Sequence, residues 1–137
     1  RMDALEGVVQ VGANGVGTLE VSSGGQLRSQ AGQVGIENAG QVIVGHADAR
    51  WEVAGDLEVG VNDFAVLTID DQAEVLAKNV FMGRREGATA TAFVLRNALW
   101  RVEKELAIAE NGANDSIVNP IGSIVLNRLN LIVATST

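Results

Sequence analysis

The chain has 137 residues, a formal charge of −7 and a pI of about 4.6, which disfavours attraction to nucleic acid or to an anionic membrane surface. Apolar residues make up 47% of it, enough for a continuous core, but aromatic residues make up only 4% and cysteine is absent. The composition therefore excludes disulfides and thiolate metal sites, and no apolar run reaches the roughly 18 to 20 residues that span a bilayer.

An apolar residue followed by a marker glycine recurs along the chain. The markers are Gly12, Gly35, Gly60 and Gly83, separated by 23, 25 and 23 residues, with an imperfect fifth copy at Ile108-Ala109. Apolar residues stand one position and, except at Gly32, three positions before each marker. They stand again seven and nine positions after the first three markers. Alternation with a period of two predicts half-buried strands, and their repetition at this spacing predicts a β-solenoid.

Taken in order, the repeats divide residues 1–137 into a single all-β solenoid segment of about five coils, each with three short strands. The coils span roughly residues 8–32, 33–55, 56–79, 80–105 and 106–137. Residues 96–111 can also be interpreted as a helix, because Glu, Lys, Leu and Ala favour helices. Their alignment with residues 49–60 favours a strand instead. In the fourth coil, the pattern of Ala92 to Leu95 does not decide which side chains face inward.

Stacking explains why such a sequence repeats. A single coil cannot bury its apolar face, whereas stacked coils pair their backbones and align like side chains. Both ends of a stack expose strand edges, which invite another chain to add. Because the chain begins with Arg1 and shows no signal peptide, we expect a segment of a longer polypeptide or fibre. End-to-end self-association through the exposed edges is the first expected interaction.

One repeat resembles those of a known class of proteins. Its pattern is carried by Trp51, Gly55, Asp56, Leu57, Val59, Gly60, Leu67, Thr68 and Ile69, and it is matched in the first coil by Val11-Gly12, Gly17-Thr18-Leu19 and Gly24-Gly25. It resembles the repeats of bacterial autotransporter adhesins and PEP-CTERM-associated surface proteins. The resemblance covers about residues 9–100 and implies a right-handed parallel β-helix exported to the cell surface, with no shared catalytic residues.

The resemblance has departures and a weaker competitor. Gly60 is followed by Val-Asn-Asp-Phe-Ala instead of a glycine-rich link, and coils four and five lose much of the consensus. The pattern Gln33-x-Gly35-x-x-Asn38 is also similar to curli-type amyloid repeats. Those units have two strands, so a third strand in each coil argues against them.

Two groups of residues could carry catalytic chemistry. His46 is the only histidine, and Asp48 lies two residues away; a catalytic role would need a nucleophile or carboxylate partner, and a solvated turn is the favoured interpretation. Asp70 and Asp71 are adjacent, so on a strand they would point to opposite faces. We therefore expect a turn at this pair and no joint acid–base action.

Binding residues are equally sparse. Oxygen ligands for Ca²⁺ occur at Glu110, Asn111, Asn114 and Asp115, but the calcium-binding nonapeptide pattern is absent. Outward Asn, Thr and Ser side chains could bind sugars with Trp51 or Trp100 stacking on them, although core filling is the favoured role for both rings. The glycines of residues 11–17 precede a strand, which excludes a phosphate site at a helix N-terminus.

The sequence thus favours a non-enzymatic, secreted or cell-surface solenoid segment without a cofactor. It would act as the structural or adhesive shaft of a bacterial surface protein, or as an extracellular filament subunit, with matrix or host glycans and proteins as partners. The alternative is a fragment of a β-helical carbohydrate-active enzyme or phage-type depolymerase. Such an enzyme would group acidic side chains of neighbouring coils around a groove.

Overall fold

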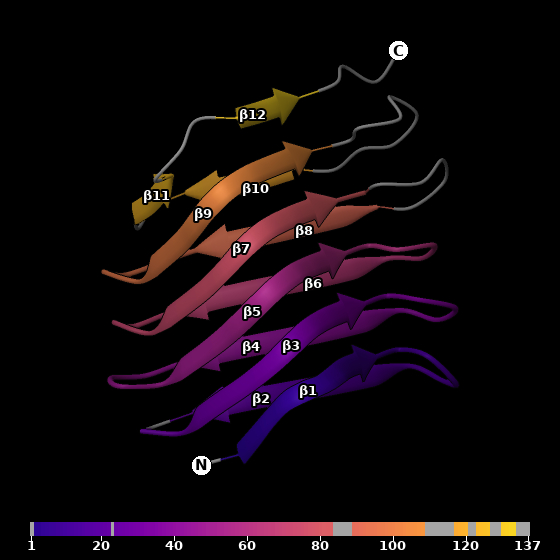
Figure 1. Ribbon diagram of the computed structural model, residues 1–137, viewed down its shortest axis with the longest axis horizontal. Helices are drawn as coiled ribbons and strands as arrows, with labels where there is room; N and C mark the ends of the chain where they lie inside the picture. Colours follow the sequence, from indigo (N-terminus) through magenta and orange to yellow (C-terminus); the bar gives the residue numbers. More distant parts are fainter. Residues whose placement is uncertain are drawn as a thin grey trace.

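In the computed structural model, the regular elements of the described residues are β-strands, and all their pairings are parallel (Figure 1). The structure describes residues 2–22, 24–83, 89–108, 117–120, 123–126 and 130–133, with side chains described in 7–22, 24–83 and 89–108. No helix in these ranges is long and apolar enough to cross a membrane.

The strands form two sheets that face each other. The long-strand sheet contains β1 (Met2–Val11), β3 (Gln26–Val34), β5 (Arg50–Val59), β7 (Glu74–Met82), β9 (Leu99–Ile108) and β11 (Ser123–Leu126), in that order, with β12 (Asn130–Val133) also paired to β9. The short-strand sheet contains β2 (Gly17–Ser22), β4 (Gly40–Gly45), β6 (Ala65–Asp70), β8 (Ala90–Val94) and β10 (Ile117–Pro120).

The chain alternates between the sheets as it climbs, which makes a solenoid of about four turns. In Figure 1 the long strands cross the front from left to right and the short strands return behind them, while the chain rises from the N-terminus. The winding is therefore right-handed, the hand that parallel crossovers adopt. The predicted parallel β-solenoid is confirmed. Of the predicted fifth coil, residues 106–137, the structure describes the end of β9 and three short strands.

From β1 to β9, each coil contains two strands rather than the predicted three. The expected strands around Trp51 and around Leu57 are one continuous strand, β5, which crosses the predicted coil boundary at residues 55–56. The ladder between β5 and β7 continues past this point with a register shift between Val53 and Asp56. The ladders between β3 and β5 and between β7 and β9 have register shifts at the same level. A β-bulge bends a strand without ending its pairing, so the third corner expected in these coils is a bulge.

The core consists of inward-facing columns that run along the solenoid axis, and their members are the alternating residues of the sequence pattern. Two columns from the short strands are Leu19–Val42–Leu67–Ala92 and Val21–Val44–Ile69–Val94. Three from the long strands are Leu27–Trp51–Val75–Trp100, Ser29–Val53–Ala77–Val102 and Val11–Val34–Val59–Met82–Ile108.

The fourth coil follows the same columns. Ala92 and Val94 are fully buried, whereas Phe93 between them lies on the outer face, which settles the orientation that the sequence left open. The segment interpreted either as a helix or as a strand is strand β9, so the strand prediction is confirmed.

Candidate functional site

The marker glycines form one corner of the solenoid, where each long strand turns toward the next short strand. Gly12, Gly35, Gly60 and Gly83 all have positive φ, between 59° and 81°, a conformation that favours glycine. A Cβ built on Gly35 would lie 2.8 Å from the carbonyl oxygen of Phe64 in the next coil. The markers are thus fixed by backbone shape and close stacking. We call this corner, residues 12–16, 35–39 and 60–64, the glycine corner.

Both tryptophans lie in the core, as the favoured interpretation predicted, and neither presents a ring to a sugar. Trp51 is fully buried, and its indole N–H donates to Ser29 Oγ at 3.1 Å in the coil below. A Cβ on Gly32 would lie 2.6 Å from Cζ2 of this ring. In the inward column Val9–Gly32–Leu57–Val80–Leu106, Gly32 is therefore the one non-apolar member because the ring of Trp51 fills the space of its missing side chain. The Nε1 of Trp100 is also buried but has no hydrogen-bond partner.

The outer face of the long-strand sheet carries polar contacts between successive coils. Gln10 Nε2 donates to Gln33 Oε1 at 2.9 Å, and Gln33 Nε2 donates to Glu58 Oε1 at 3.3 Å. Arg28 Nε lies 3.5 Å from Glu52 Oε2 in the same sheet. These groups are partly solvated, so each contact contributes little to stability. All three contacts join side chains of neighbouring coils, so they favour the observed register between the coils.

The opposite corner, where short strands turn into long ones, holds most of the residues considered for catalysis. Its turns comprise residues 24–25, 45–49, 70–73 and 95–98, and we call it the polar corner. His46 Nδ1 lies 3.2 Å from Asp71 Oδ2 of the next coil, with both side chains largely in solvent. The structure therefore pairs the histidine with a carboxylate across coils, not with Asp48. His46, Asp48 and Asp71 all have positive φ, which agrees with the predicted turns.

Asp70 and Asp71 have different partners. Both carboxylate oxygens of Asp70 accept hydrogen bonds from Arg96 of the next coil, at 2.9 and 2.7 Å. This hydrogen-bonded arginine holds the pKa of Asp70 below its ordinary value of 3.8, against an opposing effect of burial. Asp70 is thus anchored to Arg96, whereas Asp71 lies beside His46.

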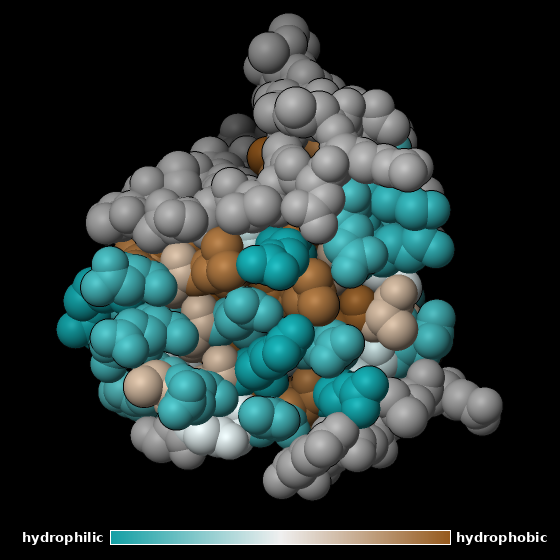
Figure 2. Space-filling model, turned by 60° about the vertical axis from the view of Figure 1, so that its left-hand side comes forward, coloured by the Kyte–Doolittle hydropathy of each residue, from teal (hydrophilic) through white to brown (hydrophobic). Residues whose placement is uncertain are grey.

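A polar groove lies beside these turns and was not identified from the sequence. It is lined by Gly24, Gln26, Asp48, Ala49, Arg50, Gln72 and Glu74, which come from three successive coils. The Nε of Arg50 lies 3.3 Å from Glu74 Oε1 but is enclosed and makes no hydrogen bond, so the pair is an ion pair with poor angular geometry. Figure 2 turns this side of the molecule toward the reader and shows hydrophilic residues over much of it.

The groove contains two carboxylates of neighbouring coils, those of Asp48 and Glu74. Gln26, Arg50 and Glu74 occupy the same register position in successive coils. This alignment could have indicated the groove from the sequence, but only with the coil register already known. The oxygen groups of Glu110, Asn111, Asn114 and Asp115, for which the sequence favoured no bound metal, lie outside the described residues. Within the described part of the chain, no group of three or more His, Asp or Glu side chains could hold a metal ion.

No protein-family model, curated protein or solved structure matches this chain.

Proposed function

We propose that this chain is a non-enzymatic, secreted solenoid segment that serves as the structural or adhesive shaft of a bacterial surface protein or as a subunit of an extracellular filament. The observation that carries the proposal is the continuity of both ladders. Strands β3, β5 and β7 are hydrogen-bonded to a neighbour on each side, and so are β4, β6 and β8. The resemblance of residues 51–69 to repeats of exported bacterial proteins supports the same role.

The physical reason is that a stack transmits load and length without a separate scaffold. Each added coil extends the axis by about 4.8 Å, pairs its backbone with the coil below and lengthens every core column. Cross-coil contacts such as Arg28–Glu52 and Asp70–Arg96 tie the outer faces along the same axis. Many such coils stacked on one axis form a rod, which suits a shaft that holds a binding element away from a surface.

Electron microscopy of the purified chain over a concentration series tests this proposal and separates its two forms. Fibres with the axial repeat of about 4.8 Å expected for stacked coils would identify a filament subunit. Uniform particles that stay the size of one chain at high concentration would identify a shaft segment. Amorphous aggregates at every concentration, or fibres whose diffraction lacks this axial repeat, would contradict both forms.

The polar groove supports one alternative, a carbohydrate-active enzyme. Glycoside hydrolysis commonly uses two carboxylates that flank the scissile bond, and Asp48 and Glu74 line the groove from neighbouring coils. Glu74, however, is already paired with Arg50. Release of reducing sugar from a panel of neutral and acidic polysaccharides tests this alternative directly.

The matched variants are Asp48→Asn, Glu74→Gln and, as a control outside the groove, Asp71→Asn. Asparagine tolerates the positive φ of Asp48 and Asp71. Sugar release that is lost in the first two variants and kept in the control would establish the enzyme and overturn the shaft proposal. Absence of release by the unmodified protein at high concentration removes the alternative.

A further inference from the structure

The two outer faces of the solenoid differ sharply in charge. Strands β3, β5, β7 and β9 of the long-strand sheet contain eleven charged residues, whereas β2, β4, β6 and β8 of the short-strand sheet contain two, Glu20 and Asp70. Asp70 is neutralised by its bidentate pair with Arg96. Glu20 is thus the one unpaired charge that the described strands place on this face, at the edge formed by β2.

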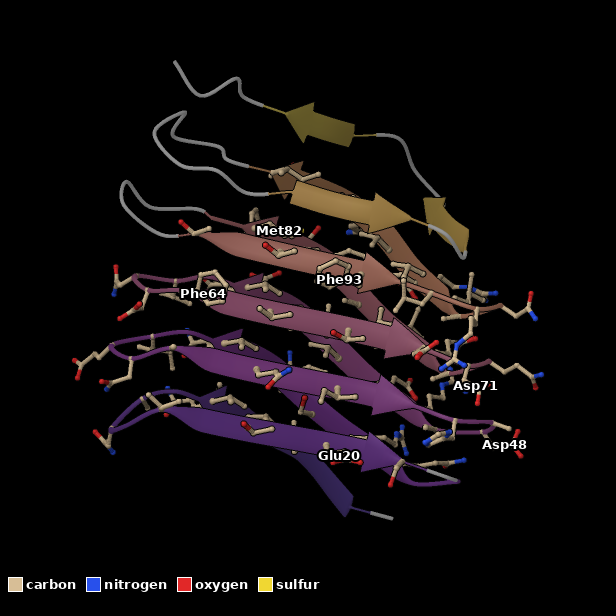
Figure 3. All side chains as sticks on the ribbon, turned by 180° about the vertical axis from the view of Figure 1, so that it is seen from behind. Glu20, Asp48, Phe64, Asp71, Met82 and Phe93 are labelled. Atoms are coloured by element: carbon tan, nitrogen blue, oxygen red, sulfur yellow. The ribbon has the colours of Figure 1, made fainter. Side chains whose placement is uncertain are left out.

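The short-strand face is also regular and partly apolar. Its ladders from β2 to β8 have no register shift, unlike the long-strand ladders. Ile43, Val66 and Phe93 lie half-buried on it among threonines, and Figure 3 views this face with Phe93 and Glu20 upon it. Three more side chains adjoin it at the glycine corner: Val16, Ala39 and Phe64.

These corner residues alternate in size in successive coils. Val16 is 81% exposed and Phe64 47% exposed, while Ala39 lies between them at the same register position. An open, mainly apolar groove runs over Ala39 and Gly40 between the two larger side chains. The corner therefore presents both a projecting ring and a hollow, which is the condition for a self-complementary, two-fold contact.

We propose that the short-strand face is a side-by-side contact surface between two copies of this chain. A two-fold axis that runs along the strand direction between β4 and β6 places Phe64 of each copy over Ala39 of the other. The same axis places Ile43 of each copy over Thr68 of the other. It also places strand β2 of each copy, which carries Glu20, over strand β8 of the other. This contact is separate from end-to-end stacking, which uses strand edges, and it does not depend on the proposed function.

The near absence of charge on this face permits a second copy as the occupant, and the projecting Phe64 beside the hollow at Ala39 selects it. Two chains that each carry −7 repel each other unless their carboxylates stay apart and solvated, and this face is the one among the described strands that allows such an approach. A charged partner would find no complementary charges on it. The face measures roughly 19 Å by 19 Å for four strands of five or six residues, below the roughly 800 Å² per partner of a stable interface. The dimer is therefore weak and reversible.

Sedimentation velocity from about 10 µM to about 1 mM protein, a range suited to weak association, tests the proposal. We expect a reversible monomer–dimer equilibrium that ends at the dimer. Phe64→Glu buries a carboxylate in the contact and raises the dissociation constant about tenfold or more. Ala54→Glu makes the same charge change at an exposed position of β5 and leaves the constant within about twofold. Glu20→Gln removes a carboxylate from the interface and lowers the constant.

A monomer up to the highest concentration overturns the proposal, and so does an equal effect of Phe64→Glu and Ala54→Glu. Growth beyond the dimer that is the same in Phe64→Glu and in the unmodified chain would show that end-to-end stacking is the whole association, which supports the filament form of the proposed function and overturns this contact. A saturable dimer that Phe64→Glu abolishes supports the contact, whatever the electron micrographs show about stacking.

Discussion

Trp51 and Trp100 occupy the same inward column two coils apart, but only one of them has a hydrogen-bond acceptor. Trp51 is bonded to Ser29, which is 1% exposed and lies in the coil below. The residue at the equivalent position below Trp100 is Ala77, and it offers no acceptor to the buried indole. The column therefore predicts opposite effects for Ser29→Ala and Ala77→Ser.

The magnitudes follow from the cost of an unpaired buried donor. Ser29→Ala leaves the indole N–H of Trp51 without an acceptor, which costs about 1–3 kcal/mol. Because the substitution also removes a buried hydroxyl, we expect a loss near the lower end, about 1–2 kcal/mol. Ala77→Ser supplies the acceptor that Trp100 lacks, and we expect a gain of about 0.5–1 kcal/mol in the free energy of unfolding.

Urea denaturation followed by circular dichroism and tryptophan emission measures both changes, and coincidence of the two signals checks for two-state unfolding. Replacing the indole by phenylalanine is the control for each position. In Trp51→Phe, Ser29→Ala should no longer destabilise, and in Trp100→Phe, Ala77→Ser should destabilise because its hydroxyl is unpaired. A destabilising Ala77→Ser in the presence of Trp100, with a neutral Ser29→Ala, would refute the reasoning.

Three further predictions concern the backbone and the polar corner. Gly32→Ala places a Cβ against the ring of Trp51 and should cost about 1–3 kcal/mol, most of which Trp51→Leu restores if the clash is the cause; an unchanged cost in the double variant contradicts this. Gly35→Ala, at φ +71° and against backbone, should destabilise by about 1–2 kcal/mol or more, whereas Gly15→Ala, which meets nothing within 4 Å, should be neutral in the same melts. The ion pair that lowers the pKa of Asp70 contributes its full stabilisation above the ordinary pKa of 3.8, and this contribution disappears as the pH falls through the lower folded pKa. Asp70→Asn should reduce the loss of the free energy of unfolding between about pH 5 and pH 2 by less than about 1 kcal/mol, because the arginine partner is largely solvated. If this loss is the same in the variant and in the unmodified chain, the ion pair with Arg96 does not stabilise the fold.

The sequence determined the features that depend on local geometry and on a fixed alternation. The inward columns and the turn glycines were predictable because a strand alternates its faces every two residues and a positive φ favours glycine. The burial of Val42 and Val44 and the positive φ of Gly35 and Gly60 follow from such rules. A core role for Trp51 was predictable because Trp51 and Val53 alternate with polar residues and so share the inward face of their strand.

Tertiary structure alone decided which corner and surface residues of different coils meet. The coil length varies because bulges absorb additional residues, as between Val53 and Asp56, so one fixed spacing could not align every coil. For that reason the partner of His46 is Asp71 and not the nearer Asp48, and the polar groove could not be assembled from the sequence. Gly32 is explained only by a ring that arrives from the next coil. The pleat of a strand sets which of its side chains point inward. Which side chains of neighbouring coils touch is set by how each bulge and corner positions the next coil.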